Sequence, residues 1–298
     1  MKDRPEGFRL YEYGIFTAAL LFTILFCVCA GSVGIPVKDT LTAIWNSIFD
    51  LPIPEGISKS IIVLVRLPRV LCAALIGAAL SLGGGAMQGL LRNPLADGST
   101  LGVASGASLG AVIAIAFGIS IPSIPFGGTM VLAMIFAFLS LIIILSLAYR
   151  LDFSLSTNTI ILIGVIFTMF TNSIISFIVT FAGPKVKSIM FWTMGSLAGS
   201  SYANALTLLF ALMVFGTIII LCSRELNAFA IGEENARHVG VNVKRVKLMV
   251  LISVSALTGV CVSIGGTIGF VGLVIPHMTR MLTGPNHKRL LPASLFSG

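Results

Sequence analysis

Six long stretches of this chain contain no Asp, Glu, Lys or Arg, and they constrain its fold more than any other feature. The stretches are 13–37, 70–91, 98–149, 153–184, 188–223 and 248–279. About 20 apolar residues in a helix cross a bilayer core of roughly 30 Å. Most of the stretches therefore suit one span, and 98–149 is long enough for two. Because they are continuously apolar and do not alternate, they predict helices rather than the strands of a membrane barrel.

The composition agrees with a membrane location. Only 10% of the residues are charged and 56% are hydrophobic, whereas a soluble domain has about 25% charged residues. The net charge of +8 reflects membrane topology, since no basic cluster with interleaved aromatics indicates nucleic-acid binding. Five cysteines lie inside apolar runs without a C-x-x-C motif, which predicts buried thiols and no metal site.

We therefore predict an all-α, polytopic membrane protein with a single domain over 1–298 and eight complete spans. The first run shows no cleavage pattern of a signal peptide and is retained as a span. Residues 36–60 form a polar connection and 190–199 a short surface helix, while 290–298 begin a ninth span. The predicted spans are 14–34, 66–91, 101–118, 129–149, 157–182, 202–222, 248–264 and a short one within 270–282.

The distribution of Lys and Arg predicts the orientation. With the N-terminus inside, the inner segments hold thirteen Lys and Arg and the outer segments hold six. Cytoplasmic loops carry the excess of these residues, so we predict a cytoplasmic N-terminus in the cell membrane. The polar segment 224–247 is then also cytoplasmic.

A weak internal repeat links 74–94 to 256–276, with eight identities in 21 positions. The two segments cross the membrane in opposite directions in the predicted topology. Inverted repeats of this kind are common in transporters. Glycines spaced by four predict closely packed helices. They are Gly85/Gly89, Gly102/Gly106/Gly110, Gly195/Gly199 and Gly265/Gly269.

The residues bear on two functional classes, an intramembrane serine protease and an ion-coupled transporter. Gly106 to Gly110 match G-x-S-x-G, which with His277 would suit an intramembrane serine protease, but a five-residue match in a Gly-rich helix is weak. An ion-coupled transporter needs a titratable group in its path. The span interiors contain no Asp or Glu, and His277 is the only candidate there.

Two charged features suggest docking surfaces. Arg66 and Arg69 lie three residues apart, on one helical face at the outer end of a span. They suit either anchoring at the lipid interface or pairing with carboxylates of a soluble partner. In 224–247, Gly232 separates two short helices, the second with acids first and bases last. This segment is either a solvated loop or a lever that docks into a partner. The sequence contains no P-loop, so if transport is ATP-driven, the motor is another chain.

Four motifs together resemble the FecCD/BtuC-type permeases of ABC importers. The first is Arg66-Leu67-Pro68-Arg69 with Gly77-Ala78-Ala79-Leu80 and Gln88. The second is Arg92-Asn93-Pro94-Leu95-Ala96 with Leu101-Gly102 and Gly106-Ala107. The third is Ile231-Gly232-Glu233 with Ala236 and Val239-Gly240. The fourth is Gly269-Phe270-Val271-Gly272-Leu273-Val274-Ile275-Pro276-His277 with Arg280 and His287-Lys288-Arg289-Leu290-Leu291-Pro292.

The resemblance implies a ten-helix fold, so a chain that ends at Gly298 would be cut short. It also implies a homodimer or a pair with a paralogous permease, two ATPase subunits that bind ATP-Mg, and an extracytoplasmic binding protein. The expected cargo is a ferric siderophore, with cobalamin or haem as alternatives, and no cofactor on this chain. The implied sites are docking by Arg66 and Arg69, ATPase coupling by Gly232, Glu233, Ala236, Arg237 and Gly240, and a gating or pathway role for Gln88, Asn93, Pro94, Pro276 and His277.

Overall fold

The computed structural model describes residues 7–31, 33–49, 51–52, 60–121, 127–153 and 155–298. Every regular element that these residues form is a helix, which confirms the all-α prediction. Short 3-10 or π segments occur at Ser60–Arg66 (η1), Gly98–Leu101, Gly183–Lys185 and Leu212–Gly216. The α-helices are α1 Leu10–Cys29, α2 Val37–Ile48, α3 Leu67–Leu91, α4 Val103–Ala116, α5 Gly127–Leu151, α6 Thr157–Phe181, α7 Val186–Thr193, α8 Tyr202–Ala211, α9 Thr217–Leu221, α10 Ser223–Phe229, α11 Glu233–His238, α12 Val243–Gly265, α13 Val271–Thr283 and α14 His287–Ser297.

Six of the eight predicted spans form helices that are long and apolar enough to cross a membrane. They are Leu10–Cys29, Ser60–Leu91, Gly127–Leu151, Thr157–Phe181, Tyr202–Leu221 and Val243–Gly265. The other two spans correspond to α4 and α13, which are helices at the predicted places but have 14 and 13 residues. Both are shorter than the roughly 20 residues that a perpendicular crossing needs.

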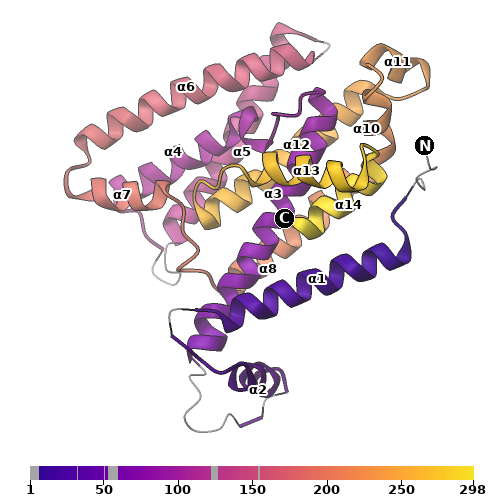
Figure 1. Cartoon of the computed structure of the whole chain (residues 1–298). Coiled ribbons are helices and arrows are strands. Elements are labelled where there is room, and N and C mark those ends of the chain that lie inside the picture. Colours follow the sequence, from indigo (N-terminus) through magenta and orange to yellow (C-terminus); the bar gives the residue numbers. More distant parts are fainter. Residues whose placement is uncertain (1–6, 32, 50, 53–59, 122–126, 154) are drawn as a thin grey trace.

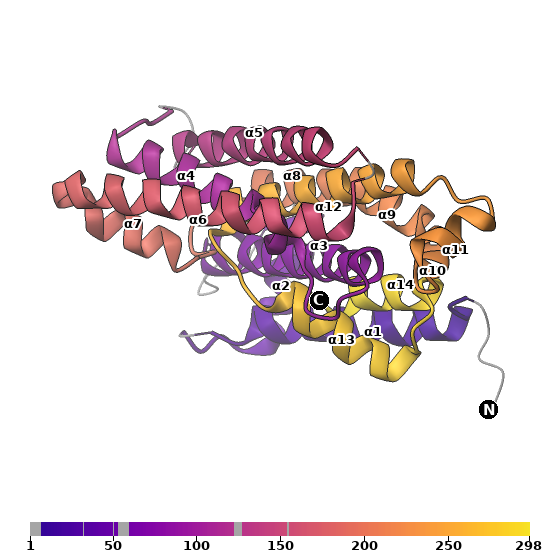
Figure 2. The same ribbon diagram turned by 90° about the horizontal axis from the view of Figure 1, so that it is seen from above.

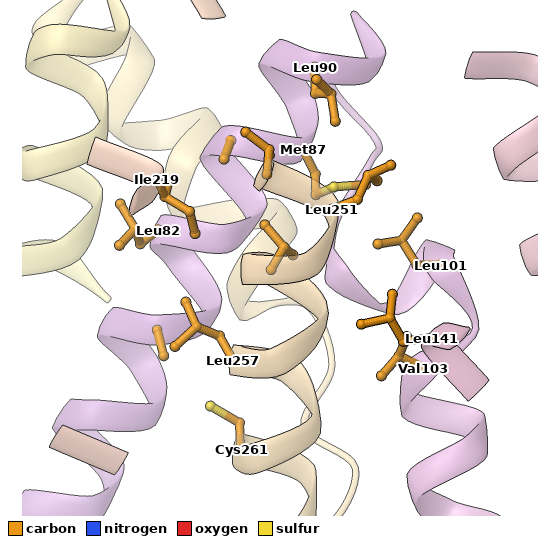
Figure 3. Close-up of a cluster of buried hydrophobic side chains, with 14 of the residues drawn as sticks. Leu82, Met87, Leu90, Leu101, Val103, Leu141, Ile219, Leu251, Leu257 and Cys261 are labelled. Atoms are coloured by element: carbon orange, nitrogen blue, oxygen red, sulfur yellow. The ribbon is translucent and has the colours of Figure 1, made fainter. Parts of the chain in front are cut away.

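Helices α3 and α12 form the centre of the bundle. Figures 1 and 2 both show them between α1 on one side and α5 and α6 on the other. They run antiparallel, as Figure 3 shows: Leu82 lies below Leu90 on α3. Leu251, in contrast, lies above Cys261 on α12. Most of the apolar window of α12 is buried, whereas little of that of α1 is buried.

Glycines let α4 and α5 pack backbone to backbone, as the four-residue spacing predicted. The Cβ position of Gly106 is occupied by the Ser140 side chain, and that of Gly110 by the carbonyl oxygen of Leu132. Small residues allow this approach in lipid, where packing drives helix association.

The spacing argument was wrong at Gly195 and Gly269. Gly195 lies beyond α7, in a left-handed conformation with φ +74° that ends the predicted surface helix early. Gly269 lies in the connection between α12 and α13, where an added Cβ meets nothing within 4 Å. The four-residue spacing of glycines therefore does not predict helix packing where the glycine lies outside a helix.

The predicted repeat between 74–94 and 256–276 agrees with the opposite directions of α3 and α12, but the two segments do not have the same structure over their whole length. Gly83 of α3 contacts Val254 and Gly265 of α12 contacts Ile76, which confirms the antiparallel crossing. Beyond this point the halves differ, because α3 continues to Leu91 while α12 ends at Gly265. Gly266 has φ +73°, a conformation that stops the helix and that L side chains rarely adopt.

The connection predicted as polar over 36–60 contains a helix of its own, α2. Helix α2 was not predicted because Lys38 and Asp39 lie in its first turn, and the prediction of helices relied on runs without charged residues. The two short helices predicted in 224–247 are confirmed as α10 and α11. Figures 1 and 2 show α10 and α11 at the same end of the bundle as the start of α1.

Candidate functional site

Arg66 is buried and binds the end of α1. Its Nη1 donates to the carbonyl oxygens of Val28 and Cys29, both at 3.3 Å, and its Nη2 donates to that of Val33. The last carbonyls of a helix lack partners within the helix, so this guanidinium satisfies the C-terminus of α1. The structure does not present Arg66 and Arg69 together to solvent, because the Arg66 side chain is buried against the end of α1.

Arg69, in contrast, is exposed. Both arginines border a cavity of about 1140 Å³ between α1, the start of α3, residues 194–197, residues 265–269 and the end of α14. Its lining is mainly apolar, so Arg66 and Arg69 supply its positive charge. None of the five predicted pathway residues is among the described residues that line this cavity.

The predicted coupling residues form a small exposed helix bracketed by glycines. Gly232 has φ +110° and Gly240 has φ +87°, so both turns need residues without a Cβ. Ala236 is fully buried, whereas Arg237 is exposed and Glu233 is partly buried. The segment is thus attached through one side of α11 and leaves the other side exposed.

A buried ion pair attaches α11 to the rest of the bundle. Lys247 Nζ lies 2.7 Å from Glu233 Oε1, and the Lys247 side chain is only 1% exposed. Lys247 Nζ also donates to the carbonyl oxygen of Leu155 at 2.8 Å, and Thr157 Oγ1 donates to Glu233 Oε1 at 3.2 Å. Residues from the starts of α6, α11 and α12 therefore meet at one point. The sequence argument missed Lys247 and treated it only as the end of a polar segment.

Helix α10 is bound to the start of α14 by a second polar cluster. Asn227 Nδ2 donates to Asn286 Oδ1 at 2.8 Å, and the main-chain N–H of His287 donates to Asn227 Oδ1 at 2.8 Å. His287 Nδ1 lies 2.8 Å from the same oxygen. Nδ1 must donate to this acceptor, so Nε2 is unprotonated in the neutral ring and faces Gly89. Burial, and then the charge of Arg280, lower the pKa of His287 to about 4.

Two of the predicted pathway residues, Gln88 and Pro276, lie at the crossing of α3 with α13. Gln88 is buried, and its Nε2 donates to the Leu273 carbonyl oxygen at 3.1 Å. Pro276 is buried inside α13 and packs near Gly85. They position two helices against each other.

The other three predicted pathway residues lie elsewhere. Asn93 Oδ1 accepts from the Leu95 N–H at 2.9 Å and closes the turn after α3, where Pro94 is exposed. His277 is exposed on α13. The structure therefore does not gather Gln88, Asn93, Pro94, Pro276 and His277 into one site.

The geometry offers no support for a protease. Ser108 Oγ donates to the carbonyl oxygen of Ala104 in its own helix, at 2.9 Å. Ser108 is buried on α4, which packs on α5, whereas His277 is exposed on α13, which packs on α3 and α14. A serine nucleophile needs a base within hydrogen-bond reach, and no hydrogen bond joins these two residues in the described part of the chain.

Metal binding was not predicted, and the described residues contain no group of three or more His, Cys, Asp or Glu side chains that could hold an ion. Of the five cysteines predicted to be buried, Cys72, Cys222 and Cys261 are buried, but Cys27 is exposed on α1. Cys27 borders the cavity between α1 and α3, which apolar periodicity does not reveal in a helix that is apolar all round.

The arrangement of helices and motifs matches a known family. The sequence pattern of the FecCD transport family matches residues 19–298. YvrB, an uncharacterised ABC transporter permease of Bacillus subtilis, is 40% identical over 99% of this chain and 84% of its own length. The cobalamin import permease BtuC of Halobacterium salinarum is 35% identical over 87% of this chain and 68% of its own length. Other relatives carry the names of molybdate, hemin and iron(3+)-hydroxamate permeases.

A solved structure has the same fold. It is described as an inward-facing conformation of an ABC transporter of the metal-chelate type, and it superposes with a TM-score of 0.82 at 31% identity. The match covers 95% of this chain and 85% of the other. Together with the apolar helices, these likenesses show that the chain belongs to the FecCD transport family and is a multi-pass permease of an ABC importer.

Proposed function

We propose that this chain is the membrane-spanning subunit of an importer that takes up a ferric siderophore. The observation that carries the proposal is the family match over residues 19–298. The match to an iron(3+)-hydroxamate permease, 33% identical over 96% of this chain, supports an iron complex as cargo. Cobalamin is the second candidate, because the cobalamin permease of Halobacterium salinarum is 35% identical.

The proposed assembly has two permease subunits, either identical or paralogous, and two ATPase subunits that bind ATP-Mg. An extracytoplasmic binding protein delivers the cargo. This chain holds no cofactor and contributes no ATP hydrolysis in the proposal. In the proposal the N-terminus is cytoplasmic, together with α10 and α11. The start of α1 lies at the same end of the bundle as these two helices.

The docking surfaces follow from exposure. Arg69 is free to face a carboxylate of the binding protein, whereas Arg66 already binds carbonyl groups of α1. The exposed side of α11, including Arg237, faces the ATPase subunits. The buried crossing with Gln88 and Pro276 serves as packing between helices that rearrange during transport.

Reconstitution in proteoliposomes tests the function and the cargo together. The permease, its ATPase and its binding protein are supplied with a radiolabelled ferric hydroxamate, cobalamin or hemin. ATP-dependent uptake of the iron complex is expected. Uptake of cobalamin alone would instead identify cobalamin as the cargo. Uptake driven by an ion gradient without ATP would overturn the importer mechanism. Arg69→Glu is expected to weaken docking of the binding protein, with the exposed Arg150→Glu as the control.

A further inference from the structure

We propose that Lys247 is a positioning residue, which fixes the coupling helix α11 to the central helix α12 so that motion of α11 is transmitted into the membrane. The inference rests on the proposed function, because it assumes that α11 receives the motion of an ATPase. It concerns the step between ATP hydrolysis and opening of the transport path.

The contacts of Lys247 join three helices at one atom. Lys247 Nζ lies 2.7 Å from Glu233 Oε1 at the start of α11 and 2.8 Å from the Leu155 carbonyl oxygen just before α6. Thr157, the first residue of α6, donates to the same carboxylate oxygen. Lys247 itself lies in the second turn of α12. A displacement of Glu233 therefore pulls on α12 and α6 together.

Helix α11 has few other attachments. Of its six residues only Ala236 is buried, while Glu234, Asn235, Arg237 and His238 are exposed. The left-handed glycines Gly232 and Gly240 flank it, and glycine turns resist bending less than turns of other residues. Helix α11 also packs against the short neighbouring helix α10. The ion pair supplies a polar contact between α11 and α12, which defines the orientation of α11 relative to α12.

Helix α12 extends from this point to the other end of the bundle. It has 23 residues, a length of roughly 35 Å at 1.5 Å per residue. Its last residue, Gly265, borders the cavity that Arg66 and Arg69 also line. The Ser196 N–H donates to the Gly265 carbonyl oxygen at 2.9 Å, so the far end of α12 also holds the loop after α7. A rigid, buried helix thus connects the coupling segment with the wall of the cavity.

Stabilisation of the fold does not by itself explain the ion pair between Lys247 and Glu233. Apolar residues of similar volume often replace a buried ion pair without loss of stability, whereas removal of one partner leaves an unpaired buried charge. The variant that separates the two roles is therefore the double substitution Lys247→Met with Glu233→Gln. It leaves no unpaired charge and nearly preserves the side-chain volumes, but it removes the connection between α11 and α12.

The experiment measures cargo imported per ATP hydrolysed in proteoliposomes that contain the whole importer. We expect this ratio to fall roughly fivefold or more in the double variant, while the ATPase subunits still co-purify and the melting temperature stays near that of the wild type. The single variant Lys247→Arg should keep most of the wild-type ratio of cargo to ATP, because it keeps the cation. The control is Lys244→Met, on the same helix.

The outcomes separate this inference from the proposed function. If the wild-type importer shows no ATP-driven uptake, the proposed function fails. If the wild type transports and the folded double variant transports as much per ATP, Lys247 does not position the coupling helix. An equal loss in Lys244→Met would also overturn the assignment. Should the double variant not fold, Glu233→Gln in the whole importer is judged by the same ratio against Lys244→Met.

Discussion

The Cβ position of Gly84 on α3 is occupied by the main-chain carbonyl oxygen of Gly272 on α13. In return, a Cβ on Gly272 would lie 2.9 Å from the Leu80 carbonyl oxygen. The two helices therefore cross with backbone against backbone, and the Gln88 bond to Leu273 lies one turn further along α3. Packing of this kind holds α13 in place although it is too short to span the membrane by itself.

Gly84→Ala is expected to destabilise the protein by about 1–3 kcal/mol, because the added methyl group meets a main-chain atom that cannot rotate away. Thermal unfolding of the detergent-solubilised protein measures the effect. Gly14→Ala is the control, since an added Cβ at this position in α1 meets nothing within 4 Å. Its melting temperature should stay equal or rise. Equal melting temperatures for both variants would contradict the close crossing.

Arg66→Met should cost about 1–3 kcal/mol, because the carbonyl groups at the end of α1 lose their donor. Arg69→Met should change the free energy of unfolding by less than about 0.5 kcal/mol, since its side chain is exposed. Paired denaturation curves in one detergent give the comparison. A larger loss in Arg69→Met than in Arg66→Met would show that the two side chains are assigned the wrong way round.

His287 predicts a loss of stability in acid. Its pKa is lowered from 6.5 to about 4 in the folded protein, mainly by burial. The unfolded chain thus binds more protons between these values, so stability is full above pH 6.5 and falls as the pH drops towards 4. The loss is on the order of 3 kcal/mol. Melting temperatures across this range should lose part of their slope in His287→Gln but not in His238→Gln, where the side chain is exposed.

Arg289→Met should release the segment before α1. Arg289 Nη2 pairs with the Glu12 carboxylate, and its guanidinium lies 5.9 Å from the centre of the Phe8 ring. The pair is largely buried, and removal of one partner of such a pair costs about 3–5 kcal/mol. Trypsin cleavage after the exposed Arg9 should become faster, whereas the exposed Arg150→Met should leave the rate unchanged. Unchanged cleavage in Arg289→Met would mean that other contacts hold this segment.

Local features of the sequence were sufficient to predict the fold class and most of the membrane-spanning helices. Charge-free runs predicted the six helices of spanning length, because lipid excludes charges from any helix that crosses it. Gly232 predicted the break between α10 and α11, since a glycine with φ +110° interrupts a helix. The family motifs predicted the permease class, which the likeness over residues 19–298 confirms.

The site residues were predicted less well, for a reason that Arg66 and Lys247 share. Both are cations beside apolar runs, which by themselves indicate anchoring at the lipid interface. Their actual partners are main-chain carbonyl groups and a carboxylate of other helices. Spacing along one helix cannot show these partners.

The sequence by itself determined that this chain is an α-helical membrane protein, because hydropathy and helix-breaking residues act within single segments, and its motifs indicated the permease family. Only the tertiary structure decided that Arg66 faces inward, that Gly84 meets Gly272 and that Lys247 binds Glu233. The hydrogen-bonded residues Gln88 and Leu273 are 185 positions apart in the sequence, and Arg66 and Val28 are 38 apart. Which partner a buried polar group finds depends on how the helices pack, and that arrangement is a property of the whole bundle.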